Sequence, residues 1–153
     1  MDVEALHRPG GPDLRGAGRE LHVLERALPA MPASTALARM TARIACRAWR
    51  VPQVADDGVL LASELVTAAV RATAGVRVVL RVLMTPRRLR IEAHDPSGRL
   101  VAAIGDGRVL AGRLPMDPVQ QEVVRALTCR CGVDPSGPGS QAWGELALQA
   151  QTR

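Results

Sequence analysis

The 153-residue sequence predicts an α+β domain, built as a two-layer sandwich with a mixed, mostly antiparallel sheet covered on one face by about three helices. Residues 76–94 hold two runs in which apolar and polar side chains alternate, as in paired strands with one wet face. Residues 34–50 and 58–70 carry apolar side chains at helical spacing. A chain of this length is expected to bury a sizeable core as one domain.

Order is expected to begin near Glu20. Residues 1–19 are rich in glycine and proline, show no apolar period and alternate in the sign of their charges. They are therefore predicted to form a disordered arm ahead of a domain that spans residues 20–150. The first element, at residues 21–28, is predicted to be an edge strand ended by Pro29 and Pro32.

A first helix is predicted from Ser34, whose hydroxyl suits an N-cap after Pro32. Its core-facing residues at helical spacing are expected to be Leu37, Met40, Ile44 and Ala48. A second stripe of the same helix is basic and contains Arg39, Arg43, Arg47 and Arg50. An arginine stripe is either a solvated face or a surface for an acidic partner.

The second helix, residues 58–70 (GVLLASELVTAAV), contains a single ionisable side chain, Glu64. Two interpretations of this carboxylate stay open. Glu64 lies on the one wet edge of a mostly buried helix, or it stands in a ligand pocket where desolvation raises its pKa and makes it a base. Ala68 is four positions later and therefore on the same face.

Residues 76–84 and 89–94 are predicted to pair as a hairpin through a turn at residues 85–88. The apolar face is expected to contain Val76, Val78, Leu80, Val82, Leu89, Ile91 and Ala93, and the wet face Arg77, Arg81, Arg90 and Glu92. The second strand runs into Asp95-Pro96-Ser97-Gly98, which places a carboxylate where the chain leaves the sheet. His94 beside it is a candidate ligand or base, or a plain surface histidine.

Residues 99–115 contain apolar runs on both sides of Gly105-Asp106-Gly107, a signal for a short hairpin. A small hairpin or a packed loop is predicted, and an ordinary flexible loop also stays open, because glycine and proline are frequent here.

Composition narrows the function classes. Phe and Tyr are absent and Trp occurs twice, so a core of Leu, Val, Ala and Ile is expected, with Trp49 and Trp143 as its large anchors. The net charge of +5 permits nucleic-acid contact, but the arginines are scattered and no aromatic residues interleave them, which disfavours it. Three dispersed cysteines give no zinc spacing, and they favour reduced thiols in the cytoplasm, with no membrane span or metal site expected.

In chain order, the helix with SELVT, the hairpin and the strand ending in HDPSG resemble the histidine-kinase-like ATPase fold, and within it the bacterial anti-sigma-factor serine/threonine kinases. The likeness covers roughly residues 21–148. It includes residues 28–51 as the family's first helix and residues 142–148 (AWGELAL) as its closing strand. The family's Glu-Leu-Val-Thr-Asn-Ala corresponds to residues 64–69, ELVTAA.

The resemblance implies a role for each matching position. Glu64 would be the base that polarises the attacking hydroxyl or water, and Asp95 would accept a hydrogen bond from the adenine amino group. Thr67 and Gly98 would border the nucleotide, and Gln141 stands where the family has a threonine near the last strand. Ala68 takes the place of the magnesium-binding asparagine, and its methyl group cannot bind a metal.

A further departure lies at residues 120–124. The family's second glycine box should fall there, but the residues are QQEVV, so the phosphates would meet Glu122. Metal and phosphate contacts supply most of the stabilisation in phosphoryl transfer. The resemblance with these losses predicts a degenerate nucleotide site, in which binding of ATP and magnesium is weak or lost. Residues 99–115, at the position of the family's lid, would fold into the vacant pocket.

Two functions of different class stay open. The first is an ATP-binding regulatory protein of the anti-sigma-factor kinase type that sequesters a sigma factor or an anti-anti-sigma protein. The alternative is an active serine/threonine kinase that phosphorylates an anti-anti-sigma partner, with Glu64 as base. In the family the first helix helps form the dimer and the sigma-factor surface, so Arg39 and Arg43 are candidates for acidic contacts. The resemblance is also compatible with a homodimer, or with a heterodimer between this chain and an active paralogue.

Overall fold

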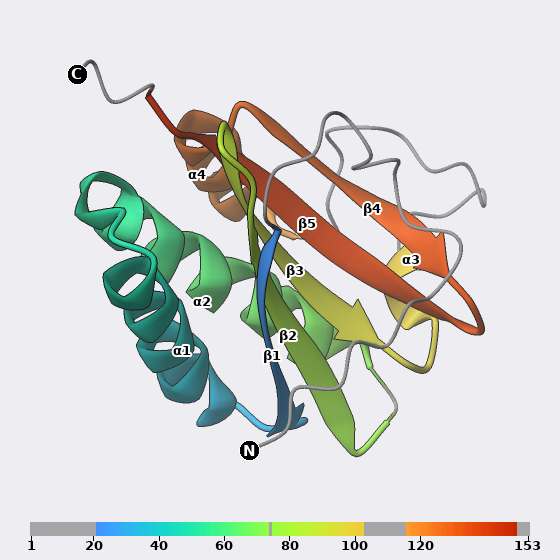
Figure 1. Cartoon of the computed structure of the whole chain (residues 1–153). Coiled ribbons are helices and arrows are strands. Elements are labelled where there is room, and N and C mark those ends of the chain that lie inside the picture. Colours follow the sequence, from blue (N-terminus) through green and yellow to red (C-terminus); the bar gives the residue numbers. More distant parts are fainter. Residues whose placement is uncertain (1–20, 74, 103–115, 150–153) are drawn as a thin grey trace.

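The computed structural model describes residues 21–73, 75–102 and 116–149, which form a five-stranded sheet with helices packed on one side (Figure 1). The strands are β1 (His22–Pro29), β2 (Arg77–Met84), β3 (Arg88–Asp95), β4 (Arg130–Ser136) and β5 (Gly139–Ala147). The helices are α1 (Ser34–Ala48), α2 (Ala55–Ala72), α3 (Arg99–Ala102) and α4 (Pro118–Leu127), with a 3₁₀ turn at Pro52–Val54. The predicted α+β class is confirmed, and the layers agree with the predicted sandwich.

The sheet order is β1-β2-β3-β5-β4, and every pair of neighbouring strands is antiparallel. The prediction of a mixed sheet is therefore wrong for the described residues. The cause is the connections: β2–β3 and β4–β5 are tight hairpins, and two helices, rather than one crossover helix, join β1 to β2. The predicted arm at residues 1–19 and residues 103–115 lie outside the described residues.

The predicted hairpin is confirmed. Met84 pairs with Leu89, and the turn is closed by Thr85 N donating to Arg88 O at 2.9 Å. The buried face consists of Val78, Leu80, Val82, Leu89, Ile91 and Ala93, none of which is exposed. Val76 precedes the strand and is 88% exposed, so its placement in the core was wrong.

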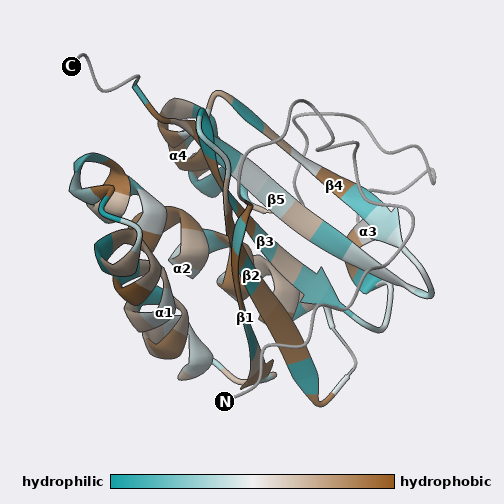
Figure 2. Cartoon of the chain, viewed as in Figure 1, coloured by the Kyte–Doolittle hydropathy of each residue, from teal (hydrophilic) through white to brown (hydrophobic). Residues whose placement is uncertain are grey.

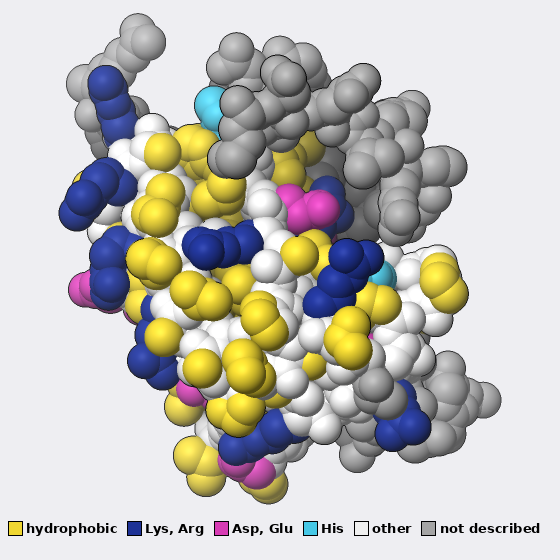
Figure 3. Space-filling model, turned by 90° about the horizontal axis from the view of Figure 1, so that it is seen from below, with side chains coloured by type: hydrophobic (Ala, Val, Ile, Leu, Met, Phe, Trp, Pro, Cys, Tyr) yellow, Lys and Arg dark blue, Asp and Glu magenta, His cyan; other side chains and the backbone are white. Residues whose placement is uncertain are grey.

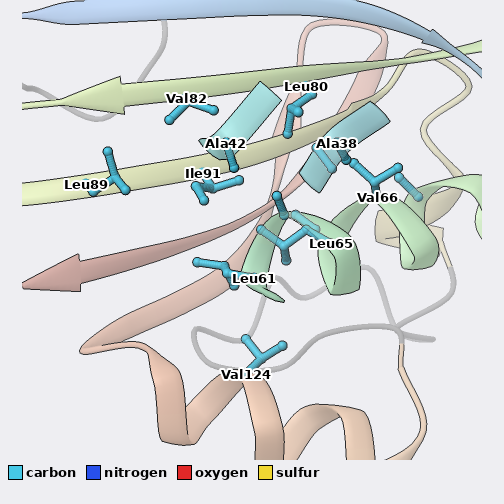
Figure 4. Close-up of a cluster of buried hydrophobic side chains, with 14 of the residues drawn as sticks. Ala38, Ala42, Leu61, Leu65, Val66, Leu80, Val82, Leu89, Ile91 and Val124 are labelled. Atoms are coloured by element: carbon cyan, nitrogen blue, oxygen red, sulfur yellow. The ribbon is translucent and has the colours of Figure 1, made fainter. Parts of the chain in front are cut away.

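The core lies between this sheet face and the helices. Leu61, Leu65 and Val66 of α2 point toward Leu80 and Ile91 of the sheet (Figure 4). Colouring by hydropathy agrees with a core between the sheet and the helices (Figure 2). Strand β2 is largely hydrophobic, whereas hydrophobic and hydrophilic segments alternate along α1 and α2. None of the helices in the described ranges is long and apolar enough to cross a membrane.

Helix α1 begins and ends close to where the sequence predicted, but it presents a different face to the core. The buried residues are Ser34, Ala38, Thr41, Ala42, Ala45 and Cys46. Met40 and Ile44, which were expected to be buried, are 44% and 51% exposed. Small side chains at the contact let α1 approach α2 and the sheet closely, so alanine replaces the larger residues there.

Ser34 is the first residue of the helix and not its cap, which corrects that expectation. The preceding residue, Ala33, makes no side-chain capping hydrogen bond. The buried Ser34 hydroxyl instead donates to Pro29 O at 2.6 Å, which ties the start of α1 to the end of β1. Residue 34 therefore fixes the turn between strand and helix.

The sheet face opposite the helices is not wet throughout, contrary to the prediction. Arg77 is exposed there, but Arg90 and Glu92 are buried, as are Trp143 and Glu145 of β5. Trp143 thus anchors this second face rather than the core between sheet and helices. Trp49 is half-buried and its ring lies 5.7 Å from that of His22.

In the segment at residues 99–115 only the first four residues are described, and they are not the strand that the hairpin alternative requires. Arg99–Ala102 form the short helix α3, and Leu100 is fully buried in the core. Strand β4 was not predicted, because Gly132 and Pro135 make its sequence resemble a turn.

Candidate functional site

The candidate site lies between α2, the end of β3 and the start of α4. Buried Leu61, Leu65 and Ala68 face the core, so Glu64 stands at the margin of the buried stripe and is half-buried. Its Oε2 atom accepts a hydrogen bond from Gln120 Nε2 at 3.0 Å. The other end of that amide, Gln120 Oε1, accepts from Arg71 Nη1 at 3.4 Å. One glutamine of α4 therefore bridges two turns of α2.

Helix α4 places Gln120 by means of its own N-terminal cap. Asp117 is the N-cap residue and its carboxylate accepts from Gln120 N at 2.9 Å, with Pro118 in the first turn. A helix N-terminus offers free N–H groups to a phosphate. Here one of those groups is already bonded to an internal carboxylate.

Glu122 does not face this site. Its side chain is 76% exposed and lies 3.7 Å from Arg125 one helical turn later. In the folded chain the Glu122 side chain is therefore exposed to solvent beside Arg125. The residue of α4 that stands against Glu64 is Gln120.

Asp95 is fully buried at the end of β3, and both carboxylate oxygens are in use. Oδ1 accepts from Ser97 N at 2.9 Å and from Ser97 Oγ at 2.7 Å, and Oδ2 accepts from Leu100 N at 3.2 Å. Burial raises the pKa of this carboxyl, but hydrogen bonds from Thr73, Ser97 and Leu100 outweigh it and leave the pKa below its usual value. Asp95 is thus held ionised by the turn that follows it.

The turn after Asp95 packs tightly on the turn between β4 and β5. Gly98 adopts φ +77°, a conformation that glycine allows, and a Cβ there would lie 3.1 Å from Pro138 O. A Cβ on Gly139 would come 2.4 Å from Asp95 O. The two glycines serve this contact between turns, which leaves the Asp95 backbone covered.

Strand register places Ser140, and not Gln141, beside Asp95. Asp95 pairs with Ser140, whereas Gln141 pairs with His94. Directly opposed residues of an antiparallel pair share a face, so Gln141 projects to the side away from α2. The polar group of β5 nearest the carboxylate is thus the fully buried Ser140.

Thr67 and Ala68 are taken up by the helix and the core. The Thr67 hydroxyl donates to Ser63 O at 2.7 Å, and Ala68 is 4% exposed. Within the described ranges no three His, Cys, Asp or Glu side chains are grouped so that they could hold a metal ion.

Sequence reasoning missed Gln120, Arg71, Thr73 and Ser140. One local signal was available, since Asp117-Pro118-Val119-Gln120 fits an N-cap aspartate, an N1 proline and an N3 glutamine. It predicts the start of α4, though not the contact of α4 with Glu64.

Neither the family models nor the curated proteins include a match to this chain. The likeness to the anti-sigma-factor kinases therefore rests on the order of motifs described above.

Proposed function

We propose that this chain is a regulatory binding protein of the anti-sigma-factor kinase type, with a degenerate nucleotide site, that sequesters a sigma factor or an anti-anti-sigma protein. The observation that supports this most directly is the hydrogen bond from Gln120 Nε2 to Glu64 Oε2. A general base must reach the proton it removes. One oxygen of Glu64 instead accepts a hydrogen bond from the neighbouring helix α4.

The other groups that a nucleotide would use are engaged as well. Both oxygens of Asp95 accept hydrogen bonds from its own turn, and Gln120 N at the start of α4 already donates to the Asp117 carboxylate. Ala68 offers no metal ligand and is buried. Opening this site for ATP and magnesium requires breaking several internal contacts, each contributing about 1 kcal/mol.

The partner surface is proposed on α1. Met40 and Ile44 are one turn apart and exposed, and Arg43 and Arg47 are exposed beside them. Residues 27–55 contain no acidic side chain. An apolar pair bordered by positive charge fits the face of an acidic amphipathic helix. Seen from below, the molecule likewise shows hydrophobic side chains with arginines between them and few acidic ones (Figure 3).

Arg39 and Arg43 have different standing on this surface. Arg39 Nε donates to the buried Ser63 Oγ at 3.1 Å, which fixes its side chain along α2. We therefore expect Arg43 to contribute more to an acidic partner than Arg39.

A nucleotide titration tests the proposed loss of chemistry. A fluorescent ATP analogue is titrated into the wild type, Ala68→Asn and Gln120→Ala, with and without magnesium. The wild type is expected to show no micromolar, magnesium-dependent binding. Since Asn at the buried position 68 can perturb folding, Gln120→Ala, which frees Glu64 without altering the core, is the second variant. Circular dichroism checks that both are folded.

Phosphate transfer separates the two functions. The chain is incubated with radiolabelled ATP and a partner captured from the native cell. Transfer by the wild type at a rate that Ala68→Asn does not improve would establish the active kinase instead. Under the binding proposal, capture needs no nucleotide and is lost in Met40→Asp/Ile44→Asp.

A further inference from the structure

The helix-free face of the sheet carries a buried ionic cluster centred on Arg90. Arg90 Nε donates to Glu92 Oε1 at 2.7 Å, and Arg90 Nη1 donates to Glu145 Oε1 at 3.1 Å. Arg81 Nη1 donates to Glu92 Oε2 at 3.2 Å, and Arg88 donates to Glu145. Each glutamate is thus shared by two arginines, and the Arg90 guanidinium is held by two of its three nitrogens.

Trp143 completes the cluster. The carbon at the centre of the Arg90 guanidinium lies 4.1 Å from the centroid of the Trp143 ring. The indole packs on Gly132 of β4, where a Cβ would come 3.1 Å from its Cζ2 atom. Glycine at position 132 therefore makes room for the ring, and the ring and the guanidinium hold each other in place.

Two donors of this cluster have no hydrogen-bond partner among the described residues, Arg90 Nη2 and Trp143 Nε1. Their side chains belong to residues that are only 5% and 7% exposed. A buried unpaired donor costs about 1–3 kcal/mol, and more when it is charged. Arg81 Nε also lacks a hydrogen bond, but it lies 3.1 Å from Glu25 Oε2 as an ion pair.

The chemistry of the two donors defines the kind of group that can bind to them. A guanidinium and an indole N–H can only donate hydrogen bonds, so the group that binds to them must be an acceptor with lone pairs. Arg130 lies 5.9 Å from the centre of the Trp143 ring and adds positive charge.

We propose that Arg90 Nη2 and Trp143 Nε1 form a binding site for a small oxyanion, a carboxylate or a phosphate. Charge-assisted hydrogen bonds to such an oxygen are the strong kind. The hydrogen bonds to Glu92 and Glu145 already fix the orientation of the guanidinium. The site is on the sheet face opposite Glu64 and Asp95, so it stands or falls independently of the proposed function.

Trp143 itself reports on the site. The chain has two tryptophans and no tyrosine, so in Trp49→Phe the emission comes from Trp143 alone. Sodium acetate and sodium phosphate are titrated at constant ionic strength set by chloride. The expected result is a saturable change in emission, with a dissociation constant of about 1 mM or below. Saturation by only one of the two anions shows whether the site binds a carboxylate or a phosphate. The absence of saturation with both would overturn the proposal.

Substitutions then test the two donors. Trp143→Phe keeps an aromatic ring under Arg90 but removes the N–H, and it should weaken oxyanion binding about tenfold. This is measured as the anion concentration needed to raise the melting temperature. An unchanged dependence would refute the site.

Arg130→Gln serves in case Trp143→Phe does not fold, because Arg130 is exposed. Arg26→Gln removes the same charge from an exposed position of β1 and is its matched control. Arg130→Gln is expected to weaken binding severalfold and Arg26→Gln to leave it unchanged. Equal effects of the two variants would mean that the anion responds only to the overall charge of the protein, which would contradict the proposal.

Discussion

At the residue scale, Gly137 and Gly139 lie at the turn between β4 and β5 and would resist replacement by alanine for different reasons. At Gly139 the added Cβ would clash, and at Gly137 the backbone conformation is unfavourable for alanine. A Cβ on Gly139 would lie 2.4 Å from Asp95 O, whereas one on Gly137 meets nothing within 4 Å but requires φ +59°. Gly139→Ala must therefore move backbone and should lower the free energy of unfolding by more than about 2 kcal/mol. Gly137→Ala should cost about 1 kcal/mol. Urea denaturation of both variants measures the difference, and equal costs would contradict the close contact.

Asp95 gives a second prediction at this scale. Asp95→Asn would set an amide NH₂ or a weaker acceptor against N–H groups of Ser97 and Leu100 that the carboxylate now satisfies. We expect the free energy of unfolding at neutral pH to fall by about 1–3 kcal/mol. Asp134→Asn on β4, a half-buried aspartate of the same sheet, is the control and should change it by about 0.5 kcal/mol or less. A similar loss in both variants would mean that the buried carboxylate has no special role.

How far sequence reasoning reaches is clear from these residues. Glu64 could be singled out because it is the one ionisable side chain of residues 58–70, and Asp95 because it stands where the chain leaves the sheet. Their partners could not, since Gln120 is 56 positions from Glu64 and only the fold joins them. Ser140 was missed for a different reason: shifting an alignment by one residue moves a strand side chain to the other face.

At the element scale, Val124 is the one fully buried residue of α4. Val124→Ala should lower the free energy of unfolding by about 1–3 kcal/mol and speed hydrogen exchange of the α4 amides. The matched control on the same helix is Val119→Ala, at a position that is 74% exposed, with an expected change within about 0.5 kcal/mol. Equal effects would mean that α4 is held by its cap and Gln120 rather than by packing.

Helix α1 shows why element limits are easier to predict than element faces. Its apolar residues form two adjacent stripes at helical spacing, one of larger residues with Met40 and Ile44 and one of alanines with Ala38 and Ala42. Hydropathy favours the first stripe as the core. The structure buries the second (Figure 4), because close packing against α2 and the sheet selects for small volume. The distance between α1 and the elements it packs against cannot be read from a single sequence.

At the scale of the whole molecule, both faces of the sheet carry buried carboxylates. Asp95 is on the helix face, and Glu145 is on the other. The sequence predicted only one buried face, because alternation of charged and apolar residues is typical of a sheet with one wet side. That pattern does not distinguish charges in water from charges paired with each other, such as Arg90 with Glu92 and Glu145.

The two buried carboxylates lead to a prediction about acid stability. For Glu145, burial raises the pKa, but hydrogen bonds and charge from Arg88 and Arg90 outweigh it and lower the pKa, as the turn does for Asp95. A lowered folded pKa means a contribution that is fully present above the unfolded pKa, about 4, and is lost as the pH falls through the folded value. Stability of the wild type should therefore fall below about pH 4.

Asp95→Asn and Glu145→Gln should each remove part of that slope, measured as the urea midpoint over a series of pH values. The two carboxylates share none of the hydrogen-bond partners described for them, so their contributions should add. A double variant is then expected to lose the sum of the two single changes in slope. If either single variant alone abolished the acid dependence, the two faces of the sheet would be coupled and not independent.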